Sequence, residues 1–431
     1  MELQPKVACF IHSATMELHK DSFLYEILNV LKTNKILDRL AYLCINNTGL
    51  KLDEDKIEKE YAPAHVIHYS DSTTEFETPT IKLLYAFCKF NPDYKVLYLH
   101  TKGVSYSSDH KFLPGIKSWN RYMRHCLLDN FTHCLQLLRI YDTVGCNFSV
   151  GDPPPHYSGN YWWANAIYIR NLPIAYMKDK YDPEFWLLQH NPLFFNILSM
   201  TEMYQHDHHI DDYRLAVKNG IENNIIFCKV GVQNEIIESQ LKFIANTITL
   251  ASAQCGNKVV ILDDFMDEVS SKRKPSCNVL DFHKCNELLA PHCITLIYKN
   301  QVHFELQKIE YGLLHLKTID VTEEVKSRFL RPNCLIIPKK TSFNDFCNDP
   351  CPGVFKHIYI HYTLNSVPFY MMYQEYMLNT KDSIEIKHNC YDAKQTSEKN
   401  TMDSPWMTLT DVKDMQSERD SFLSIVKQCL F

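Results

Sequence analysis

The chain lacks several features that would place it in a specialised class of protein. It has no excess of positive charge, because 45 Lys and Arg residues are outnumbered by 51 Asp and Glu residues and the formal net charge is −6. Proteins that bind the phosphate backbone of nucleic acids normally present a basic face, so we expect no nucleic-acid partner. No apolar run approaches the ~20 residues of a transmembrane helix, so we expect no membrane-spanning segment.

The N-terminus and the cysteines favour a reducing compartment. The opening segment, MELQPKVACFIHSA, has no basic stretch before its short apolar run, so it does not resemble a signal peptide. The 16 cysteines are scattered, and without a secretory signal they are expected to be free thiols. Cys347 and Cys351 lack the second pair that a structural zinc site needs. The expected location is the cytoplasm, or the host cytoplasm or virion if the protein is viral.

The first hundred residues alternate between apolar strand-like segments and amphipathic helices. The patterns predict helices at 21–34 and 75–88, and strands at 6–14, 37–49, 64–71 and 95–100. Apolar strands linked by helices predict an α/β domain with a mainly parallel sheet covered on both faces. The glycine pattern of dinucleotide-binding sites does not follow the first strand, and the P-loop pattern is missing, so neither type of site is expected.

The strand at 95–100 leads directly into a polar turn with the sequence His100-Thr101-Lys102-Gly103. Open α/β sheets bind ligands at the carboxyl ends of their strands. A lysine next to a glycine, whose lack of a side chain lets the backbone come close to a ligand, suits a phosphate group. The alternative is an ordinary strand-to-loop junction. The first two strands also end in polar residues, which include His12, Ser13, Asn46 and Asn47.

Three segments carry a resemblance to a known family. YLHTKG (98–103), HYSGNYWWANAIYIRNLP (156–173) and PEFWLL (183–188) occur in this order in GT-A fold glycosyltransferases of bacteria and large DNA viruses. The chain resembles that family over about residues 5–215. The resemblance implies a Rossmann-like GT-A domain that transfers a hexose or deoxyhexose from a nucleotide sugar to a hydroxyl of a glycan or glycoconjugate. A UDP-sugar is the favoured donor.

The resemblance also implies a donor site at the carboxyl edge of the sheet. Many GT-A enzymes hold Mn²⁺ or Mg²⁺ with an Asp-x-Asp after the fourth strand, where this chain has His100-Thr101-Lys102. Lys102 would then offset the phosphate charge, and any metal would use His100 with His206 and His208, although the latter two could simply belong to a solvated turn. Asp71 would approach the nucleoside or else serve as a turn residue. The full set of expected donor residues is His12, Ser13, Asn46, Asp71, His100, Thr101, Lys102 and Gly103.

The same resemblance places the acceptor pocket and the catalytic base in the following segments. The acceptor pocket would be lined by Tyr157, Ser158, Gly159, Asn160, Trp162, Trp163 and Asn165. If this piece is a strand, the two tryptophans point to opposite faces, and one could stack on a sugar ring; the alternative is that both belong to the core. An inverting transfer needs a base on the acceptor hydroxyl, for which Glu184 is the first candidate and Asp182 the second.

The C-terminal half predicts smaller domains after a GT-A domain at 1–218. Residues 222–300 read as a small βαβ unit that weakly resembles a piece of fucosyltransferase-type domains, and residues 301–380 alternate with period 2, which predicts an antiparallel β module. A polar linker and a last helix follow at 381–431. Two other functions remain open: a non-catalytic glycan-binding or scaffold protein with a transferase-like fold, and a bifunctional transferase with an active C-terminal domain.

Overall fold

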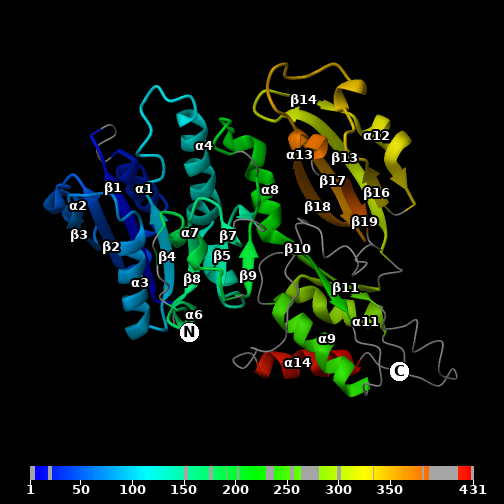
Figure 1. Cartoon of the computed structure of the whole chain (residues 1–431). Helices are drawn as coiled ribbons and strands as arrows, with labels where there is room; N and C mark the ends of the chain where they lie inside the picture. Colours follow the sequence, from blue (N-terminus) through cyan, green and yellow to red (C-terminus); the bar gives the residue numbers. More distant parts are fainter. Residues whose placement is uncertain are drawn as a thin grey trace. The chain divides into compact units, whose positions relative to one another are not determined.

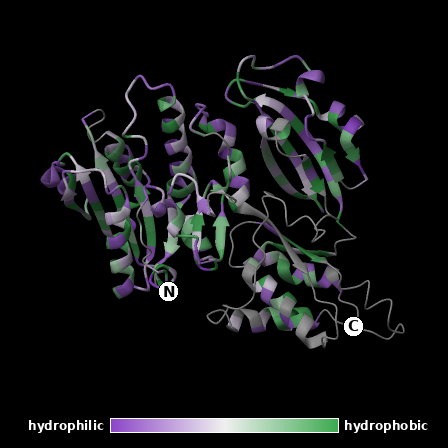
Figure 2. Cartoon of the chain, viewed as in Figure 1, coloured by the Kyte–Doolittle hydropathy of each residue, from purple (hydrophilic) through white to green (hydrophobic). Residues whose placement is uncertain are grey.

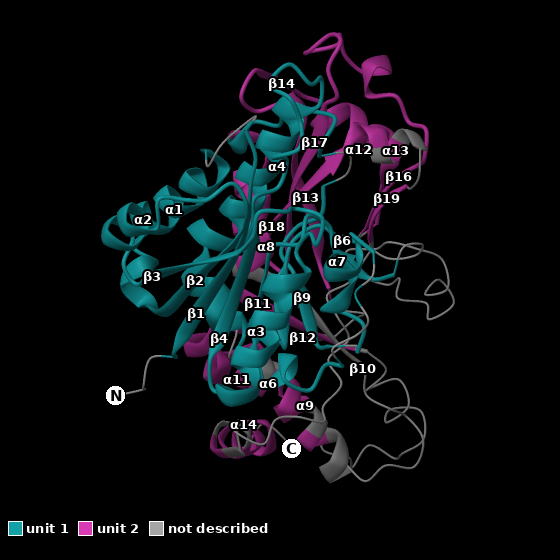
Figure 3. Cartoon of the chain, turned by 60° about the vertical axis from the view of Figure 1, so that its left-hand side comes forward, with its two compact units in different colours: residues 1–210 teal, residues 211–431 magenta. Residues whose placement is uncertain are grey.

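The chain forms two compact units, residues 1–210 and residues 211–431 (Figure 3). The computed structural model describes residues 5–17, 22–149, 154–173, 177, 179–190, 192–200, 203–229, 237–252, 257–263, 281–298, 302–332, 334–380, 383–387 and 416–428. Most of the expected polar linker, residues 388–415, lies outside the described residues. The two units are taken in turn below.

A seven-stranded sheet in the order β3-β2-β1-β4-β8-β5-β9 forms the centre of unit 1 (Figure 1). The four leading strands β1 to β4 are parallel, whereas β8 is antiparallel to both β4 and β5. The expected α/β class with a mainly parallel sheet is therefore confirmed. The strands are β1 (Val7–Thr15), β2 (Leu40–Gly49), β3 (Ala64–Ser70), β4 (Lys95–His100), β5 (Thr143–Gly145), β8 (Trp162–Asn165) and β9 (Phe194–Asn196), and a small hairpin is made by β6 (Phe148–Ser149) and β7 (His156–Tyr157).

Helices cover both faces of this sheet. Helix α1 buries five apolar residues at helical spacing, which are Phe23, Leu24, Ile27, Leu28 and Leu31. Helix α3 has a proline in its first turn, where the missing N–H costs no helical hydrogen bond. The helices of unit 1 are α1 (Ser22–Thr33), α2 (Glu54–Glu60), α3 (Thr78–Phe90), α4 (Leu113–Arg124), a π-helical turn (His125–Asp129), α5 (Phe131–Leu137), α6 (Ala166–Ile169) and α7 (Asp182–Trp186).

The two faces of the sheet follow from the period of two in a strand. On one face, Ala8 and Phe10 of β1 pack with Tyr98 of β4 against Ile81 and Leu84 of α3. Alternate residues point to the opposite face, where Trp163 of β8 donates a hydrogen bond to Leu127 O in the turn after α4. The residues that continue the α3 face toward the carboxyl ends of β1, β2 and β4 are polar, and they position the site.

Unit 2 begins within helix α8 (Ile210–Glu222) and contains a parallel sheet in the order β10-β11-β12. Alternate residues of β11 serve two cores, since Val260 and Leu262 pack with α9 and α14, whereas Val259 and Ile261 join the core of the following β module. The elements are β10 (Asn223–Lys229), α9 (Ile237–Ser252), β11 (Asn257–Asp263), α11 (Phe282–Leu289), β12 (Ile294–Tyr298) and α14 (Gln416–Gln428).

The β module of unit 2 consists of two antiparallel sheets, β14-β13-β17-β18 and β15-β16-β19. Their inner faces enclose one apolar core with Ile309, Leu335, Ile358 and Ile360. The elements are β13 (Phe304–Leu313), β14 (Lys317–Asp320), α12 (Thr322–Phe329), β15 (Leu330–Arg331), β16 (Cys334–Ile337), β17 (His357–Leu364), β18 (Val367–Gln374), α13 (Glu375–Thr380) and β19 (Ile384–Lys387).

Hydropathy follows this layering. Figure 2 shows hydrophobic residues along the strands, whereas the helices alternate between hydrophobic and hydrophilic positions, as expected of helices that cover a core from outside. Among the described residues, no helix combines the length and the apolar character that crossing a membrane requires.

Candidate functional site

Three polar side chains form a row across the centre of the unit 1 sheet. His12 of β1 is in register with Asn46 of β2 on one side and with His100 of β4 on the other. All three are buried. Each lies two positions after an apolar residue of its own strand, and therefore on the same face of the sheet, the one that α3 covers. The chain runs outward from β1 through β2 to β3 and then returns to β4 on the other side of β1. The direction in which strands are added therefore reverses between β1 and β4, and open α/β sheets bind ligands at such a switch point.

The N-terminal turn of α3 covers this row. The Thr80 hydroxyl lies 2.9 Å from His12 Nδ1 and accepts a hydrogen bond from Asn46 Nδ2 at 3.0 Å. Glu77, the residue before the helix, accepts from Tyr98 Oη at 2.7 Å and from Asn160 Nδ2 at 2.6 Å, and its other oxygen lies 3.4 Å from His100 Nδ1. Helix α3 thus ties the ends of β1, β2 and β4 to the segment around Asn160.

The Ser158-Gly159-Asn160 turn connects His100 to Glu184. His100 Nε2 donates to Gly159 O at 2.9 Å, and Gly159 N donates to Glu184 Oε1 at 2.6 Å. Gly159 has φ +97°, and a Cβ at this position would lie 2.5 Å from Met123 Sδ, so a side chain here would be strained. Tyr161 Oη donates to His100 O at 2.7 Å and fixes the other side of the strand end.

The two histidines of the row are neutral at physiological pH. Burial lowers the pKa of His12 to about 4, with the negative charge of Glu77 opposing this effect. Burial also lowers the pKa of His100 to about 3, and the positive charge of Lys102 acts in the same direction. The negative charge of Glu184 raises the pKa of His100, so Lys102 and Glu184 both act electrostatically on this imidazole.

Lys102 carries a positive charge without a carboxylate partner in the part of the chain that the structure describes. Its Nζ lies 4.4 Å from the Trp119 ring centroid, and its carbonyl accepts from Asn120 Nδ2 at 2.9 Å. Among the described residues, three buried polar atoms around this edge lack a hydrogen-bond partner: Asn46 Oδ1, Trp119 Nε1 and Asn120 Oδ1. An unsatisfied buried group costs about 1–3 kcal/mol, so this edge retains unused capacity to bind a polar ligand.

The opposite face holds a second polar network. Thr101 Oγ1 accepts from Ala14 N at 2.9 Å, and Thr15 Oγ1, which lies 3.4 Å from Ser13 Oγ, donates to Asn47 Oδ1 at 2.8 Å. Asp71 belongs to an exposed turn, where its Oδ1 lies 2.8 Å from His68 Nε2, and His68 Nδ1 lies 3.2 Å from Asn47 Nδ2.

The expected donor residues therefore gather at one edge of the sheet. Gly103 is required there, because its φ is +99° and a Cβ would lie 2.6 Å from Ile116 Cγ2.

Two expectations about the acceptor pocket are wrong. Trp162 and Trp163 do point to opposite faces, but both are buried: Trp162 stacks on Tyr98 and Trp163 bonds to Leu127 O, so neither ring is free to stack on a sugar. Asn165 lies opposite Lys95, at the start of β4, because β8 runs antiparallel to β4. Five residues separate Lys95 from His100, about 16 Å along a strand, so Asn165 belongs to the other edge of the sheet.

Tyr157 and Ser158 have local partners rather than a common pocket. Tyr157 is buried, with its hydroxyl 3.1 Å from Thr143 Oγ1 and donating to Phe195 O at 3.2 Å. Ser158 Oγ lies 3.0 Å from His156 Nε2. Of the seven expected pocket residues, the turn Ser158-Gly159-Asn160 is the part that reaches the His100 and Glu184 contacts.

The candidate bases differ in where their carboxylates lie. Glu184 is half-buried and bonds to the Gly159 backbone. Asp182 accepts from Asp179 N at 2.8 Å within its own turn. Residues two apart on a helix do not face the same side, so Asp182 and Glu184 do not converge on one point.

The three histidines proposed as metal ligands are held by different partners. His100 is bonded to Gly159, whereas the backbone of His208 is bonded to Ser118 of α4, and its ring lies 6.1 Å from that of His206. No group of three or more His, Cys, Asp or Glu residues suited to a metal was found in the described ranges. Glu77 Oε1 lies 3.4 Å from His100 Nδ1, while Glu77 Oε2 accepts two hydrogen bonds. An imidazole and one carboxylate supply fewer oxygen ligands than Mg²⁺ prefers.

Sequence reasoning missed Glu77 and Thr80, the residues that organise the row. Glu77 precedes and Thr80 lies in the first turn of a helix that the apolar pattern did predict, but nothing in their spacing shows that this helix end reaches the strand ends. The signal that could have revealed them is the change from apolar to polar residues at His12, Asn46 and His100. Buried polar side chains on the face under α3 need polar partners from the helix that covers them.

Comparisons with known proteins leave the activity open. Residues 8–195 match the model of a family described as a domain of unknown function, DUF8361. No curated protein matches the sequence significantly. A crystal structure of 4-diphosphocytidyl-2C-methyl-D-erythritol synthase is similar, with 11% identity and a TM-score of 0.28 over 50% of this chain and 99% of that chain. The synthase of the same name from Anaerococcus prevotii has 13% identity and a TM-score of 0.26 over 50% and 97%. Scores of this size identify neither substrate nor activity.

Proposed function

We propose that unit 1 is a glycosyltransferase domain that moves a sugar from a nucleotide sugar to a hydroxyl of a glycan or glycoconjugate. The observation that carries the proposal is the cation Lys102, unpaired among the described residues, at the carboxyl end of β4. Trp119 Nε1 and Asn120 Oδ1, on two residues that contact Lys102, are buried atoms without a hydrogen-bond partner in the described part of the chain. Glu184 of α7 binds the Gly159 backbone, and its charge acts on the same imidazole, that of His100, as the charge of Lys102. A diphosphate with attached polar groups would satisfy both the charge and the hydrogen-bonding capacity of this edge.

In this mechanism the chain supplies a cation and a base. Lys102 neutralises the charge that develops on the departing nucleoside diphosphate as its bond to the sugar breaks. Glu184 Oε1 is occupied by Gly159 N, and Oε2 takes the proton from the acceptor hydroxyl while the new bond forms with inversion at the sugar carbon. His100 stays neutral and holds the Gly159 carbonyl, which keeps the turn beside Glu184 in place.

The experiment is a thermal-shift panel with UDP, GDP, CDP and dTDP and their sugars, each with Mn²⁺, with Mg²⁺ or with EDTA. A ligand at ~100 times its Kd stabilises the folded protein by about 2.7 kcal/mol, so one nucleotide should raise the melting temperature clearly. A UDP-sugar is the donor to test first. A shift that persists in EDTA would indicate that Lys102 offsets the phosphate charge without a metal, whereas a shift lost in EDTA would indicate a divalent cation bound with the donor.

A non-catalytic protein that binds glycans is the second candidate, favoured by the absence of an Asp-x-Asp after β4. It predicts stabilisation by a glycan and none by any nucleotide. A bifunctional enzyme with a second active site in unit 2 predicts instead that nucleotide-sugar turnover survives loss of Lys102. If no nucleotide shifts the melting temperature, the transferase proposal is contradicted.

A further inference from the structure

Three aromatic rings on the loop that follows Lys102 form a continuous series with a fourth ring, that of Tyr204. Tyr106 and His110 have ring centroids 4.5 Å apart, His110 and Phe112 are 5.6 Å apart, and Phe112 and Tyr204 are 5.6 Å apart. We call these four residues the aromatic row. Tyr204 is 42% exposed and the other three are half-buried. The row therefore starts four residues after Lys102 and continues onto the segment that follows β9.

The loop that carries the row is ordered by its own backbone. Tyr106 N donates to Gly103 O at 3.1 Å, His110 N to Ser107 O at 3.0 Å, and Leu113 N to His110 O at 2.8 Å. Tyr106 also packs on the small apolar cluster of Phe23, Val104 and Leu113, which anchors this end of the row. Residues 101–112 connect β4 to α4 without helix or strand, and loops held by a rigid scaffold often carry binding residues.

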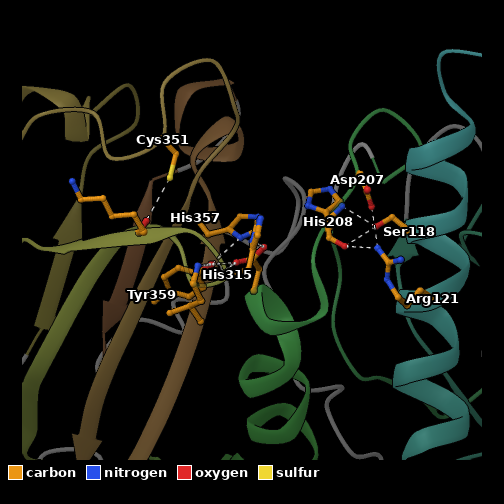
Figure 4. A network of polar contacts seen from close by, with 11 residues as sticks. Ser118, Arg121, Asp207, His208, His315, Cys351, His357 and Tyr359 are labelled. Atoms are coloured by element: carbon orange, nitrogen blue, oxygen red, sulfur yellow. Dashed lines mark hydrogen bonds and ion pairs between the residues drawn. The ribbon is translucent and has the colours of Figure 1, made fainter.

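Helix α4 holds the other end of the row, which includes Tyr204, by a polar clamp (Figure 4). Ser118 Oγ accepts from His208 N at 2.8 Å and donates to His208 O at 2.9 Å, and Arg121 donates to His208 O and to Asp207 Oδ1. Gly115 lets the chain approach closely, since a Cβ there would lie 2.4 Å from Tyr204 O. These contacts use the backbone around Tyr204, so its side chain is not needed to hold the segment.

The exposed parts of the row combine flat apolar faces with hydrogen-bonding groups. Lys111, an exposed residue, places its Nζ 4.7 Å from the Phe112 centroid, so that ring face is not packed into the core. His110 Nδ1 accepts from Phe112 N at 3.3 Å, which leaves Nε2 as the nitrogen that can donate to a ligand. The Tyr204 hydroxyl accepts from Gln205 Nε2 at 3.0 Å and can still donate. Sugars present C–H faces and hydroxyls together, which matches this mixture.

We propose that the aromatic row is the binding surface for the glycan acceptor. The inference rests on the proposed function, because the acceptor must reach the sugar carbon next to the diphosphate that Lys102 would hold. It replaces the sequence-based expectation that Trp162 or Trp163 stacks on the acceptor. The row binds one or more pyranose units of a neutral oligosaccharide through Tyr204 and Phe112, while Tyr106 holds the loop in place.

The test is saturation-transfer NMR of the full chain with cellotriose, chitotriose and mannotriose. The wild-type protein should bind at least one of them, and Tyr204→Ala should weaken that binding about tenfold, which corresponds to ~1.4 kcal/mol. Tyr204→Phe keeps the ring and should retain most of the affinity. Phe90→Ala is the matched control, because Phe90 is 86% exposed at the far end of α3.

Nucleotide binding is measured in parallel to separate the two proposals. If nucleotides stabilise the protein but no trisaccharide binds, or if Tyr204→Ala binds as tightly as the wild type, the acceptor surface is wrong and the donor site stands. If a trisaccharide binds through Tyr204 but no nucleotide does, the row is a glycan site and the transferase proposal fails.

Discussion

Two lysines show how differently the two units use charge. Lys356 in unit 2 is buried and lies 3.3 Å from Asp349 and 3.6 Å from Glu375, and Glu375 also accepts from Tyr311 Oη at 2.5 Å. Lys102 in unit 1 has an aromatic ring as its neighbour and no carboxylate partner among the described residues. A buried charge that is paired within the protein holds the fold together, whereas a charge without a partner beside a strand end is available to a ligand.

The buried acids and histidines of the two units repeat this contrast. In unit 2, Asp212 of α8 accepts from the backbone N of His315, its Oδ2 lies 2.5 Å from His315 Nδ1, and Tyr359 Oη donates to it at 3.4 Å (Figure 4). In unit 1, His12 and His100 stand in a row with Asn46, whose Oδ1 has no partner in the described part. In the unit 2 network, Asp212 receives its contacts from other residues of the network. In the unit 1 row, a hydrogen-bond acceptor, Asn46 Oδ1, is left without a partner among the described residues.

The largest effect should come from Glu184→Gln. The amide oxygen can still accept from Gly159 N, so the turn keeps its geometry, but the base is lost. General base catalysis contributes typically 10²–10⁴-fold, and turnover of the nucleotide sugar should fall by about that factor. Steady-state kinetics with the donor found in the thermal-shift panel would check this. Turnover within twofold of wild type would show that Glu184 is not the base.

Lys356→Ala should strongly destabilise unit 2 and leave nucleotide binding unchanged. Removing one partner of a buried ion pair typically costs about 3–5 kcal/mol. Here the buried Glu375 carboxylate would keep its hydrogen bond from Tyr311 but lose its cation. The matched control is Lys326→Ala, which breaks an exposed pair with Glu323 and should cost less than about 1 kcal/mol. Urea denaturation of both variants measures the difference. Equal losses would mean that Lys356 is no more structural than a surface lysine.

A smaller effect is expected from acidification of unit 1. The folded pKa values of His12 and His100 lie below the ordinary value of 6.5, at about 4 and about 3. The unfolded chain therefore binds more protons below pH 6.5, and the free energy of unfolding falls as the pH drops from 6.5 toward 4. For His12 the loss between pH 7 and pH 5 should be about 2 kcal/mol.

The variant His12→Asn isolates this contribution. Asn offers a polar group at the position of Nδ1, which can still reach Thr80 Oγ1, but it does not titrate. Urea denaturation at pH 7 and at pH 5 should show a pH dependence reduced by about 2 kcal/mol relative to wild type. An unchanged pH dependence would show that His12 is not held neutral in the folded state.

The sequence predicted the strands of the parallel sheet well, because buried parallel strands are continuous apolar runs with polar ends. The strand expected at 95–100 is β4, and that expected at 64–71 is β3. The sequence also placed His12, Asn46 and His100 at strand ends, where the structure has them, and their role as donor residues stays a prediction. The errors at Trp163 and Asn165 have a different cause: strand direction and burial depend on neighbours far along the chain, and β8 turned out antiparallel.

The central claim is that Lys102 holds the diphosphate of the donor. The direct measurement is isothermal titration of the nucleoside diphosphate that gives the largest thermal shift, against wild type, Lys102→Ala and Lys89→Ala. Lys89 is the matched control, since its Nζ also lies over an aromatic ring, 4.8 Å from the Tyr85 centroid near the end of α3. Losing a charged hydrogen bond costs about 1.5–3 kcal/mol, so Lys102→Ala should weaken binding by at least tenfold and Lys89→Ala should not. Equal affinities for all three proteins would contradict the account.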